Sequence, residues 1–280
     1  MNSLKERLIS IRDNEWVIPN DIDRYPFALE LLENIGTTDS ELRDDLILNV
    51  LWLMITEKML TKEQVRDLLE ICLSDKHLFN KLGEIENDAV FNRTFTVLII
   101  RAIIYYHITN GEDLLSKEEV INLNDTLIRY ARLEKDLRGY VDKKGWAHAM
   151  GHSGDALRSM AFCNEIGHDD LMKIVEVVKE KICISDYVYI NGEAERLVST
   201  IIIVLSRDIL EEQELIRWVN SFENTNPPKD YPEKHYYEEN VKNFLRSLYF
   251  RIKFNNSSSI IIEEIEKTLN RMNEDYNKIA

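Results

Sequence analysis

The sequence predicts an all-α protein, because helix signals recur along the chain and no segment requires a sheet. Glycine and proline are scarce, with 9 and 5 among 280 residues, so few turns are encoded and long elements are expected. No stretch alternates apolar and polar residues for long enough to predict a strand. Two capping boxes, TKEQ (61–64) and SKEE (116–119), place a Ser or Thr three residues before Glu or Gln and so mark helix starts.

The remaining elements follow in order. DSELRDDLILNVLWLMI (39–55) begins a helix at Asp39 or Ser40, with apolar residues at three- and four-residue steps. The next long helix begins at Asn87 or Asp88. A further helix is expected over about 146–166, and another begins in NGEAERL (191–197). The segment 221–237 contains Pro227 and Pro228, which cannot continue a helix, so it is a loop before the C-terminal helices.

Roughly twelve to fourteen helices are predicted, joined by short connections that favour antiparallel neighbours. This many helix pairs without a sheet predict an irregular HEAT-like α-solenoid rather than a simple bundle. We expect a single all-helical domain over residues 1–280, with a soft boundary at the loop 223–232.

Composition and charge limit the classes of partner and the cellular compartment that are expected. The net charge is −15 and no segment is strongly basic, so a nucleic-acid partner is not predicted. The three cysteines are far apart and fit a reducing cytosol. The N-terminus lacks the apolar core of a signal peptide, and the most apolar run, VLIIRAIIYYHI (97–108), is too short to span a bilayer. We therefore expect a cytoplasmic protein without membrane insertion.

The stretch GWAHAMGHSGDALRSM (145–160) carries the strongest chemical signal. On a helix, His148, His152 and Asp155 would share one face. Gly151 and Gly154 would each cost about 1 kcal/mol relative to Ala, which close packing or function must offset. No bound cofactor is predicted; if a divalent metal such as zinc binds, His148, His152 and Asp155 would hold it.

Two flanking segments add polar groups. The turn DLRGYVDKKGW (136–146) supplies candidate ligand-binding residues, and its tryptophan is interpreted mainly as a core anchor; the set is Asp136, Arg138, Asp142 and Trp146. NGEAERL adds Glu193 near the positive end of a helix dipole, with Arg196 one turn further on as a candidate anion clamp.

Three functions fit these residues. The first is a binding protein, whose concave pocket, lined by His148, His152, Asp155, Glu193 and Arg196, holds a small polar molecule or a peptide or protein segment. The second is a hydrolase, with His148 as general base and with His152, Asp155 and Glu193 as further candidate catalytic residues, or with a metal on the two histidines and a carboxylate. The third is a structural scaffold in which the stretch only packs helices. The sequence leaves open whether the protein is an enzyme.

The segment DLRGYVDKKGWAHAMGHSGDAL (136–157) resembles the central signature of a bacterial family, domain of unknown function 2785, in its R-G-Y-V-D, G-W-A-H, second His and Asp. GEAERL (192–197) and FNRTF (91–95) resemble other segments of that family, and Gly151 departs from it where a residue such as Ala is expected. The resemblance covers most of the chain and implies an all-helical cytosolic protein of Gram-positive-type bacteria, with no particular activity. Position by position it points to Asp136, Arg138, Asp142, Gly145, Trp146, His148, His152, Asp155, Glu193 and Arg196.

Overall fold

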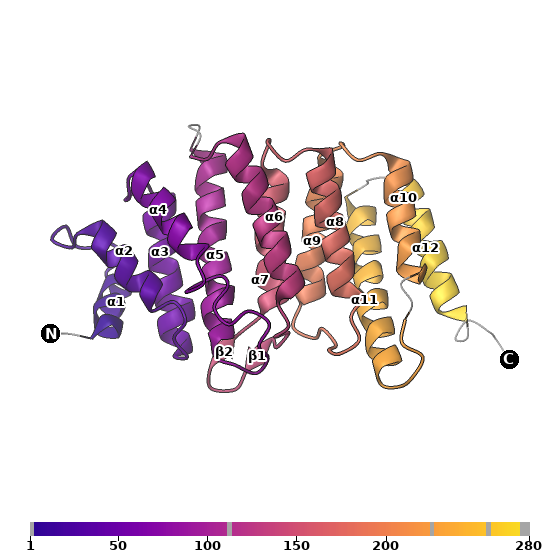
Figure 1. Ribbon diagram of the computed structural model, residues 1–280, viewed down its shortest axis with the longest axis horizontal. Coiled ribbons are helices and arrows are strands. Elements are labelled where there is room, and N and C mark those ends of the chain that lie inside the picture. The colour runs from indigo at the N-terminus through magenta and orange to yellow at the C-terminus, as the bar shows by residue number, and fades with distance from the viewer. Residues whose placement is uncertain (1–2, 111–113, 225–226, 256–258, 275–280) are drawn as a thin grey trace. The chain divides into compact units, whose positions relative to one another are not determined.

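The computed structural model describes residues 3–110, 114–224, 227–255 and 259–274. It is all-α and 68% helical, as predicted. Within the described residues there are twelve α-helices (Figure 1): α1 (Leu4–Asp13), α2 (Arg24–Glu33), α3 (Leu48–Thr56), α4 (Lys62–Cys72), α5 (Ala89–Thr109), α6 (Lys117–Leu133), α7 (Ala149–Phe162), α8 (His168–Ile182), α9 (Glu193–Ser206), α10 (Glu212–Ser221), α11 (Glu233–Phe254) and α12 (Ser259–Met272).

Two irregular helical segments accompany them. A π-helix, η1 (Glu41–Ile47), leads directly into α3, and a 3-10 turn, η2 (Phe222–Asn224), follows α10. Between η2 and α11, Pro227 and Pro228 are non-helical, as predicted, while residues 225–226 of the predicted loop 223–232 lie outside the described residues.

Helices begin at the two capping boxes, as predicted from the sequence. The Thr61 hydroxyl accepts a hydrogen bond from the Gln64 amide, and the Gln64 side chain accepts one from the Thr61 amide. The pair Ser116 and Glu119 makes the same reciprocal bonds. Each box satisfies two amide groups that have no partner inside the helix.

The chain divides into two compact units, which are described separately. The first unit comprises Met1–Glu119 and Leu133–Ala156, and the second comprises Val120–Arg132 and Leu157–Ala280. The loop 223–232 lies inside the second unit. The single domain and the solenoid arrangement stay predictions.

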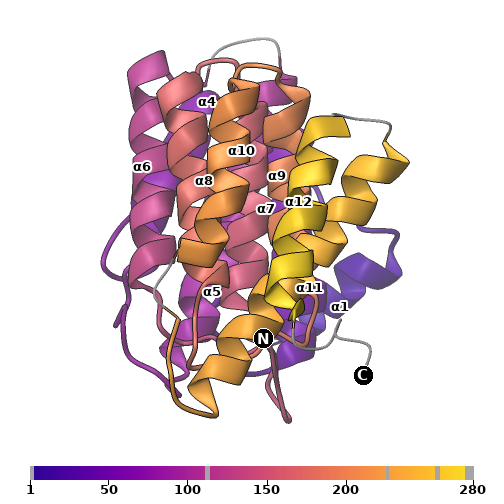
Figure 2. The ribbon, with the colours of Figure 1, turned by 90° about the vertical axis from the view of Figure 1, so that its right-hand side faces the viewer.

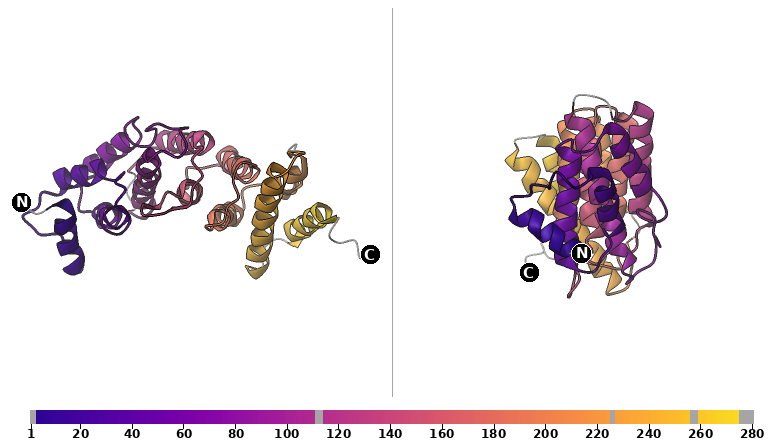
Figure 3. Two further views of the ribbon diagram at one scale, coloured as in Figure 1. Left: turned by 90° about the horizontal axis from the view of Figure 1, so that it is seen from below. Right: turned by 90° about the vertical axis from the view of Figure 1, so that its left-hand side faces the viewer.

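In the first unit, α5 is the central helix, and α3 and α4 pack against it (Figure 1 and Figure 3). An apolar stripe along this helix is buried and consists of Phe91, Phe95, Leu98, Ile99 and Ala102. Among the described residues, α5 is also the one helix long and apolar enough to cross a membrane, but 78% of its apolar window is buried. That degree of burial is typical of a core helix in a folded domain.

In the second unit, α9 packs against α11, and α12 lies beside both α10 and α11, as Figure 2 shows. Aromatic rings fill the space between α10 and α11: Trp218 and Phe244 contact Phe222, and the Trp218 indole N–H donates to the Val175 carbonyl oxygen at 3.0 Å. The indole nitrogen is therefore both buried and hydrogen-bonded, as a buried tryptophan requires.

The expectations of no sheet and of a helix over about 146–166 are wrong at residues 140–148. Strands β1 (Tyr140–Val141) and β2 (Gly145–Trp146) form a short antiparallel hairpin, and α7 begins only at Ala149. Gly145 and His148 have φ angles of +78° and +47°, which an α-helix does not accommodate. The Ala147 amide instead donates to the Gly139 carbonyl oxygen at 2.9 Å, extending the hairpin.

Candidate functional site

The hairpin is held against the start of α5 and against η1. Val141 and Ala147 pack on Val90 and Phe91 of α5. A Cβ atom added at Gly145 would lie 2.6 Å from the Ser40 Cβ, closer than real Cβ atoms approach. The close approach and the positive φ together explain why this position is glycine.

His148 is the joint between the hairpin and α7. Its φ of +47° is uncommon for a residue other than glycine and stores backbone strain. The His148 amide donates to the Arg138 carbonyl oxygen at 2.9 Å, and its own carbonyl oxygen accepts the His152 amide at 3.0 Å. The backbone of His148 thus makes the last hydrogen bond of the hairpin through its amide, and its carbonyl oxygen accepts a hydrogen bond from the first turn of α7.

The imidazole of His148 lies directly over Gly151. A Cβ atom at position 151 would fall 2.1 Å from the His148 Nε2 atom and 2.2 Å from Cδ2. An alanine here, which the resemblance leads one to expect, would require the ring to lie elsewhere. Gly151 therefore has a steric reason specific to this placement of His148.

Four edge-to-face contacts connect five rings, which we call the ring series. Their centroids are 5.2 Å apart for Tyr140 and Trp146, 5.2 Å for Trp146 and His148, 5.4 Å for His148 and His152, and 5.3 Å for His152 and Phe95. Exposure falls along the series, from 59% at Tyr140 and 40% at Trp146 to 4% at His148 and 7% at His152. The series runs from solvent to the core of the first unit.

The interpretation of Trp146 as a core anchor is therefore wrong. Trp146 faces Tyr140 across the hairpin as its register partner, and both rings lie on the exposed side. The alternation of a strand, not the stripe of a helix, sets the direction of the indole.

Asp155 is buried on α7 together with His152, while His148 precedes the helix. The two imidazoles are in contact, as the sequence spacing suggested, but their geometry is edge-to-face rather than convergent on one point. Across the described part of the chain, no three His, Cys, Asp or Glu side chains are grouped so that they could hold a metal ion.

The carboxylate of Asp136 and the guanidinium of Arg138 clamp the start of the hairpin. Arg138 donates from Nε to Oδ1 at 2.8 Å and from Nη2 to Oδ2 at 2.6 Å, a bidentate pair that raises the pKa of Arg138. Arg138 also donates to the Asn87 carbonyl oxygen at 3.2 Å, which ties the hairpin to the residues before α5. Asp142 is exposed in the hairpin turn.

A buried ion pair that the sequence analysis did not single out lies behind this clamp. Arg93 donates from Nε and Nη2 to the two carboxylate oxygens of Glu134 at 2.7 and 2.8 Å, and both side chains are fully buried. Glu134 also accepts the amide of Asp136 at 3.0 Å. The FNRTF segment hints at this role only through an arginine between two core phenylalanines.

Arg43 and Asp44 of η1 were missed entirely. Arg43 is fully buried; it donates to the Thr37 and Lys144 carbonyl oxygens at 2.6 and 2.7 Å, and its guanidinium lies 4.3 Å from the Phe91 ring centroid. It thereby fastens the hairpin turn to the core. A π-helical turn has no pattern in the sequence that distinguishes it from an α-helix, although such turns are frequent at functional sites.

Asp44 is a titratable group that accepts a hydrogen bond from the hairpin backbone. Burial raises the pKa of Asp44 to about 6, although the Arg43 guanidinium, with Nε 2.8 Å from Oδ1, and a hydrogen bond from the Trp146 amide act against that rise. A carboxyl group in this range changes protonation near neutral pH, as groups at functional sites often do.

Glu193 and Arg196 belong to the second unit. Glu193 is the buried first residue of α9, and its Oε2 atom accepts the Asn191 amide at 2.8 Å. Arg196 is exposed one turn further on. A common pocket of these two residues with the histidines stays a prediction.

Residues 78–250 match the family model described as "Protein of unknown function (DUF2785)". The match runs from before α5 into α11 and includes every site residue predicted from the sequence, whereas Arg43 and Asp44 precede it. No curated protein and no solved structure matches the chain.

Proposed function

We propose a binding function for this chain, which belongs to the DUF2785 family. The ligand is a small polar molecule or a peptide segment that places a planar cation, a guanidinium group, on the exposed rings of Tyr140 and Trp146. His148 and His152 support these rings from beneath, through the ring series. The exposed aromatic pair on a tightly held hairpin is the observation that carries the proposal.

Large exposed rings on a fixed backbone favour binding over a packing role. A hairpin that only joined helices would direct its tryptophan inward, since burying an aromatic side chain is strongly favourable. Here Tyr140 and Trp146 lie against each other in solvent, while Arg43 and Arg138 hold the backbone beneath them. Tyrosine and tryptophan on rigid elements are typical anchors of binding sites.

The net charge of the chain favours a cation. Near the rings, the Lys144 ammonium is paired with Asp88 at 2.7 Å and the Asp44 carboxylate with Arg43 at 2.8 Å, while the exposed turn carries Asp142 beside Lys143, so the local charges balance. The whole chain carries a net charge of −15, which attracts cations. Guanidinium groups stack on aromatic faces more readily than ammonium groups do.

The proposal is tested by nuclear magnetic resonance on the ¹⁵N-labelled chain. The indole N–H signal of Trp146, assigned with Trp146→Phe, is followed during titration with N-acetyl-arginine amide and with an acetyl-Gly-Arg-Gly amide peptide. We expect a saturable shift of this signal with the arginine probes and none with N-acetyl-citrulline amide, the neutral analogue of the same shape. Tighter binding of the peptide than of the amino-acid amide identifies a peptide segment as the ligand class.

The matched variants are Tyr140→Ala and Tyr231→Ala, both of which remove an exposed tyrosine ring and keep the Trp146 indole as the reporter. Binding should be lost in the first and kept in the second. An unchanged indole signal with both arginine probes, in a chain with an intact fold, would reject the binding proposal and support the scaffold alternative.

Asp44 supports a hydrolase as the second candidate. A carboxyl group with a pKa of about 6 suits general acid–base work near neutral pH, beside the earlier candidate His148. Hydrolysis of p-nitrophenyl acetate or p-nitrophenyl phosphate above the buffer rate, and its loss in Asp44→Asn or His148→Gln, would promote this candidate.

A further inference from the structure

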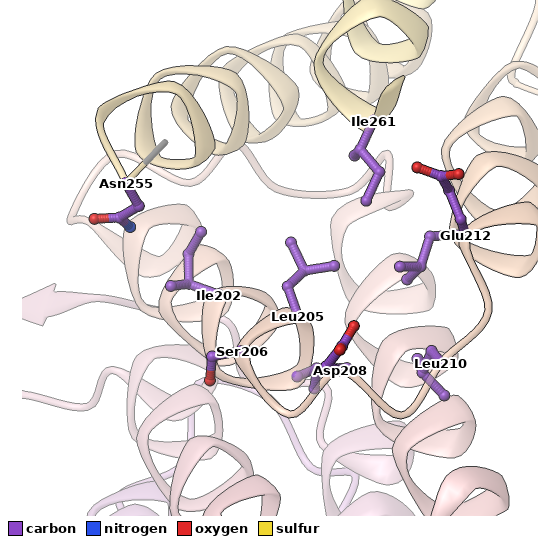
Figure 4. Close-up of a pocket in the computed structure, with 10 residues that line it drawn as sticks. Ile202, Leu205, Ser206, Asp208, Leu210, Glu212, Asn255 and Ile261 are labelled. Carbon is purple, nitrogen blue, oxygen red and sulfur yellow. The ribbon is translucent and has the colours of Figure 1, made fainter. Parts of the chain in front are cut away.

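The second unit contains a cavity that none of the site residues above lines. It has a volume of about 380 Å³ and lies between the end of α9, the start of α10, Asn255 after α11, and Ile261 of α12 (Figure 4). Small-molecule sites typically measure roughly 300 to 1,000 Å³. The cavity is therefore large enough for a small organic ligand.

Much of the cavity lining is hydrocarbon. Its lining includes Ile202, Leu205, Leu210 and Leu215, with Ile261 reaching in from α12. Leu210 and Leu215 are buried, and Leu205 is half-buried. Such a surface favours an alkyl group, because each methylene group removed from water contributes about 0.8 kcal/mol.

The lining also carries two carboxylates. Asp208 follows the end of α9 and Glu212 begins α10, and none of the ten lining residues is Lys, Arg or His. In Figure 4 both carboxylates lie around the hollow that Leu205 and Ile261 also face. An anionic ligand would meet like charges here, whereas an ammonium group would be attracted.

The position of Asp208 is fixed by the turn that contains it. Its φ is +51°, in the left-handed region that Asp adopts more readily than most residues, and its amide donates to the Leu205 carbonyl oxygen at 3.2 Å. The preceding residue, Arg207, donates to the carbonyl oxygens of Ala161 and Cys163 at 2.6 and 2.9 Å. The carboxylate is thus presented from a turn that these hydrogen bonds anchor.

We infer that this cavity binds a small amphipathic cation: an alkyl chain against Leu205 and Ile261, with a primary ammonium group between Asp208 and Glu212. This inference is independent of the proposed function, because it concerns a different unit and different residues. The ligand class follows from a hydrocarbon lining whose ionisable side chains, among the lining residues, are those of Asp208 and Glu212.

The test is isothermal calorimetry on the full chain with n-butylammonium, n-hexylammonium, hexan-1-ol and hexanoate. We expect hexylammonium to bind about fourfold tighter per added methylene than butylammonium and about tenfold tighter than hexan-1-ol, as hydrogen bonds to charged groups allow. Hexanoate should bind most weakly of the four.

The variant Asp208→Asn/Glu212→Gln removes both charges and keeps the side-chain shapes. In it, hexylammonium should bind no tighter than hexan-1-ol. The control Glu57→Gln/Asp75→Asn removes the same net charge from exposed positions of the first unit and should keep the preference. Equal binding of hexylammonium and hexan-1-ol to the wild type, a preference kept in Asp208→Asn/Glu212→Gln, or no binding of any alkyl probe would each overturn the inference.

Discussion

Replacing Gly151 by Ala should destabilise the protein, although the same change inside an unconstrained helix stabilises it. The helix gains about 1 kcal/mol when Ala replaces Gly. Against this, the new Cβ atom would lie 2.1 Å from the His148 Nε2 atom, and inserting atoms into a packed site typically costs about 1 to 3 kcal/mol. We expect a net loss of about 1 kcal/mol in the free energy of unfolding.

The ring of His148 has little room to move aside. Trp146 contacts it at 5.2 Å and His152 at 5.4 Å. Its backbone is fixed by the bonds to the Arg138 carbonyl oxygen and from the His152 amide. Relieving the clash therefore breaks ring contacts rather than only turning a free side chain.

Urea melts of a double-mutant cycle measure the effect. In a His148→Ala background the ring is gone, so Gly151→Ala should stabilise the protein by about 1 kcal/mol, which gives a coupling of about 2 kcal/mol between the two positions. Gly167→Ala is the control for coupling: a Cβ atom there meets nothing within 4 Å, and because Gly167 is the N-cap of α8, its effect should be the same with and without His148→Ala. Stabilisation by Gly151→Ala in the wild-type background would refute the placement of the His148 ring over Gly151.

Three further experiments test buried groups of the protein. Glu134→Gln should lower the free energy of unfolding, measured in urea melts, by about 3 to 5 kcal/mol because it leaves Arg93 buried without its counterion. The control Glu180→Gln, in an exposed ion pair, should lower it by less than about 1 kcal/mol. Equal costs would contradict the buried pair. The pKa of Asp44 is raised to about 6 from 3.8, so the protonated carboxyl group stabilises the folded state at low pH and this stabilisation is lost as the pH rises from 4 to 7. Over that range the cost of Asp44→Asn in the free energy of unfolding should fall by about 2 to 3 kcal/mol, at 1.36 kcal/mol per pKa unit. A cost that does not change with pH would refute the shift. Burial raises the pKa of the Cys163 thiol to about 12, so dithionitrobenzoate should label it only after unfolding, and mass spectrometry of the native protein showing early labelling would contradict this.

The helical fold was predictable because its signals are local. The boxes at Thr61 and Ser116 act within one turn, and the α5 stripe needs only its own spacing. Such patterns depend only on residues that are close in sequence, so they do not depend on how the helices are arranged.

The hairpin was not predictable, because two-residue strands are too short to show alternation. Gly145 was visible as a glycine, but the close approach of Ser40, which is distant in sequence, was not. His148 looks like a helical residue at the correct spacing from His152, and its positive φ is imposed by the hairpin. The four-residue spacing therefore predicted the contact between the two histidines correctly, although it wrongly placed both of them on a helix.

The buried arginines were hidden for a similar reason. Arg43 and Arg93 are charged residues on helices and look solvent-facing in isolation. Each is buried because carbonyl oxygens or a carboxylate from distant segments surround it: Lys144 for Arg43 and Glu134 for Arg93. Polar groups are buried only when they are hydrogen-bonded, and those partners cannot be identified from one sequence.

The contacts of the buried arginines also bear on the exposed rings, because they hold the hairpin that carries them. The strained backbone of His148 costs roughly 1 to 3 kcal/mol, and it persists because surrounding contacts hold the segment, among them those of Arg43 and Arg138. In the proposed binding function, this fixed backbone keeps Tyr140 and Trp146 in one arrangement before a ligand arrives, so that binding loses little conformational entropy. A rigid hairpin with two exposed rings is what pre-organisation for binding requires.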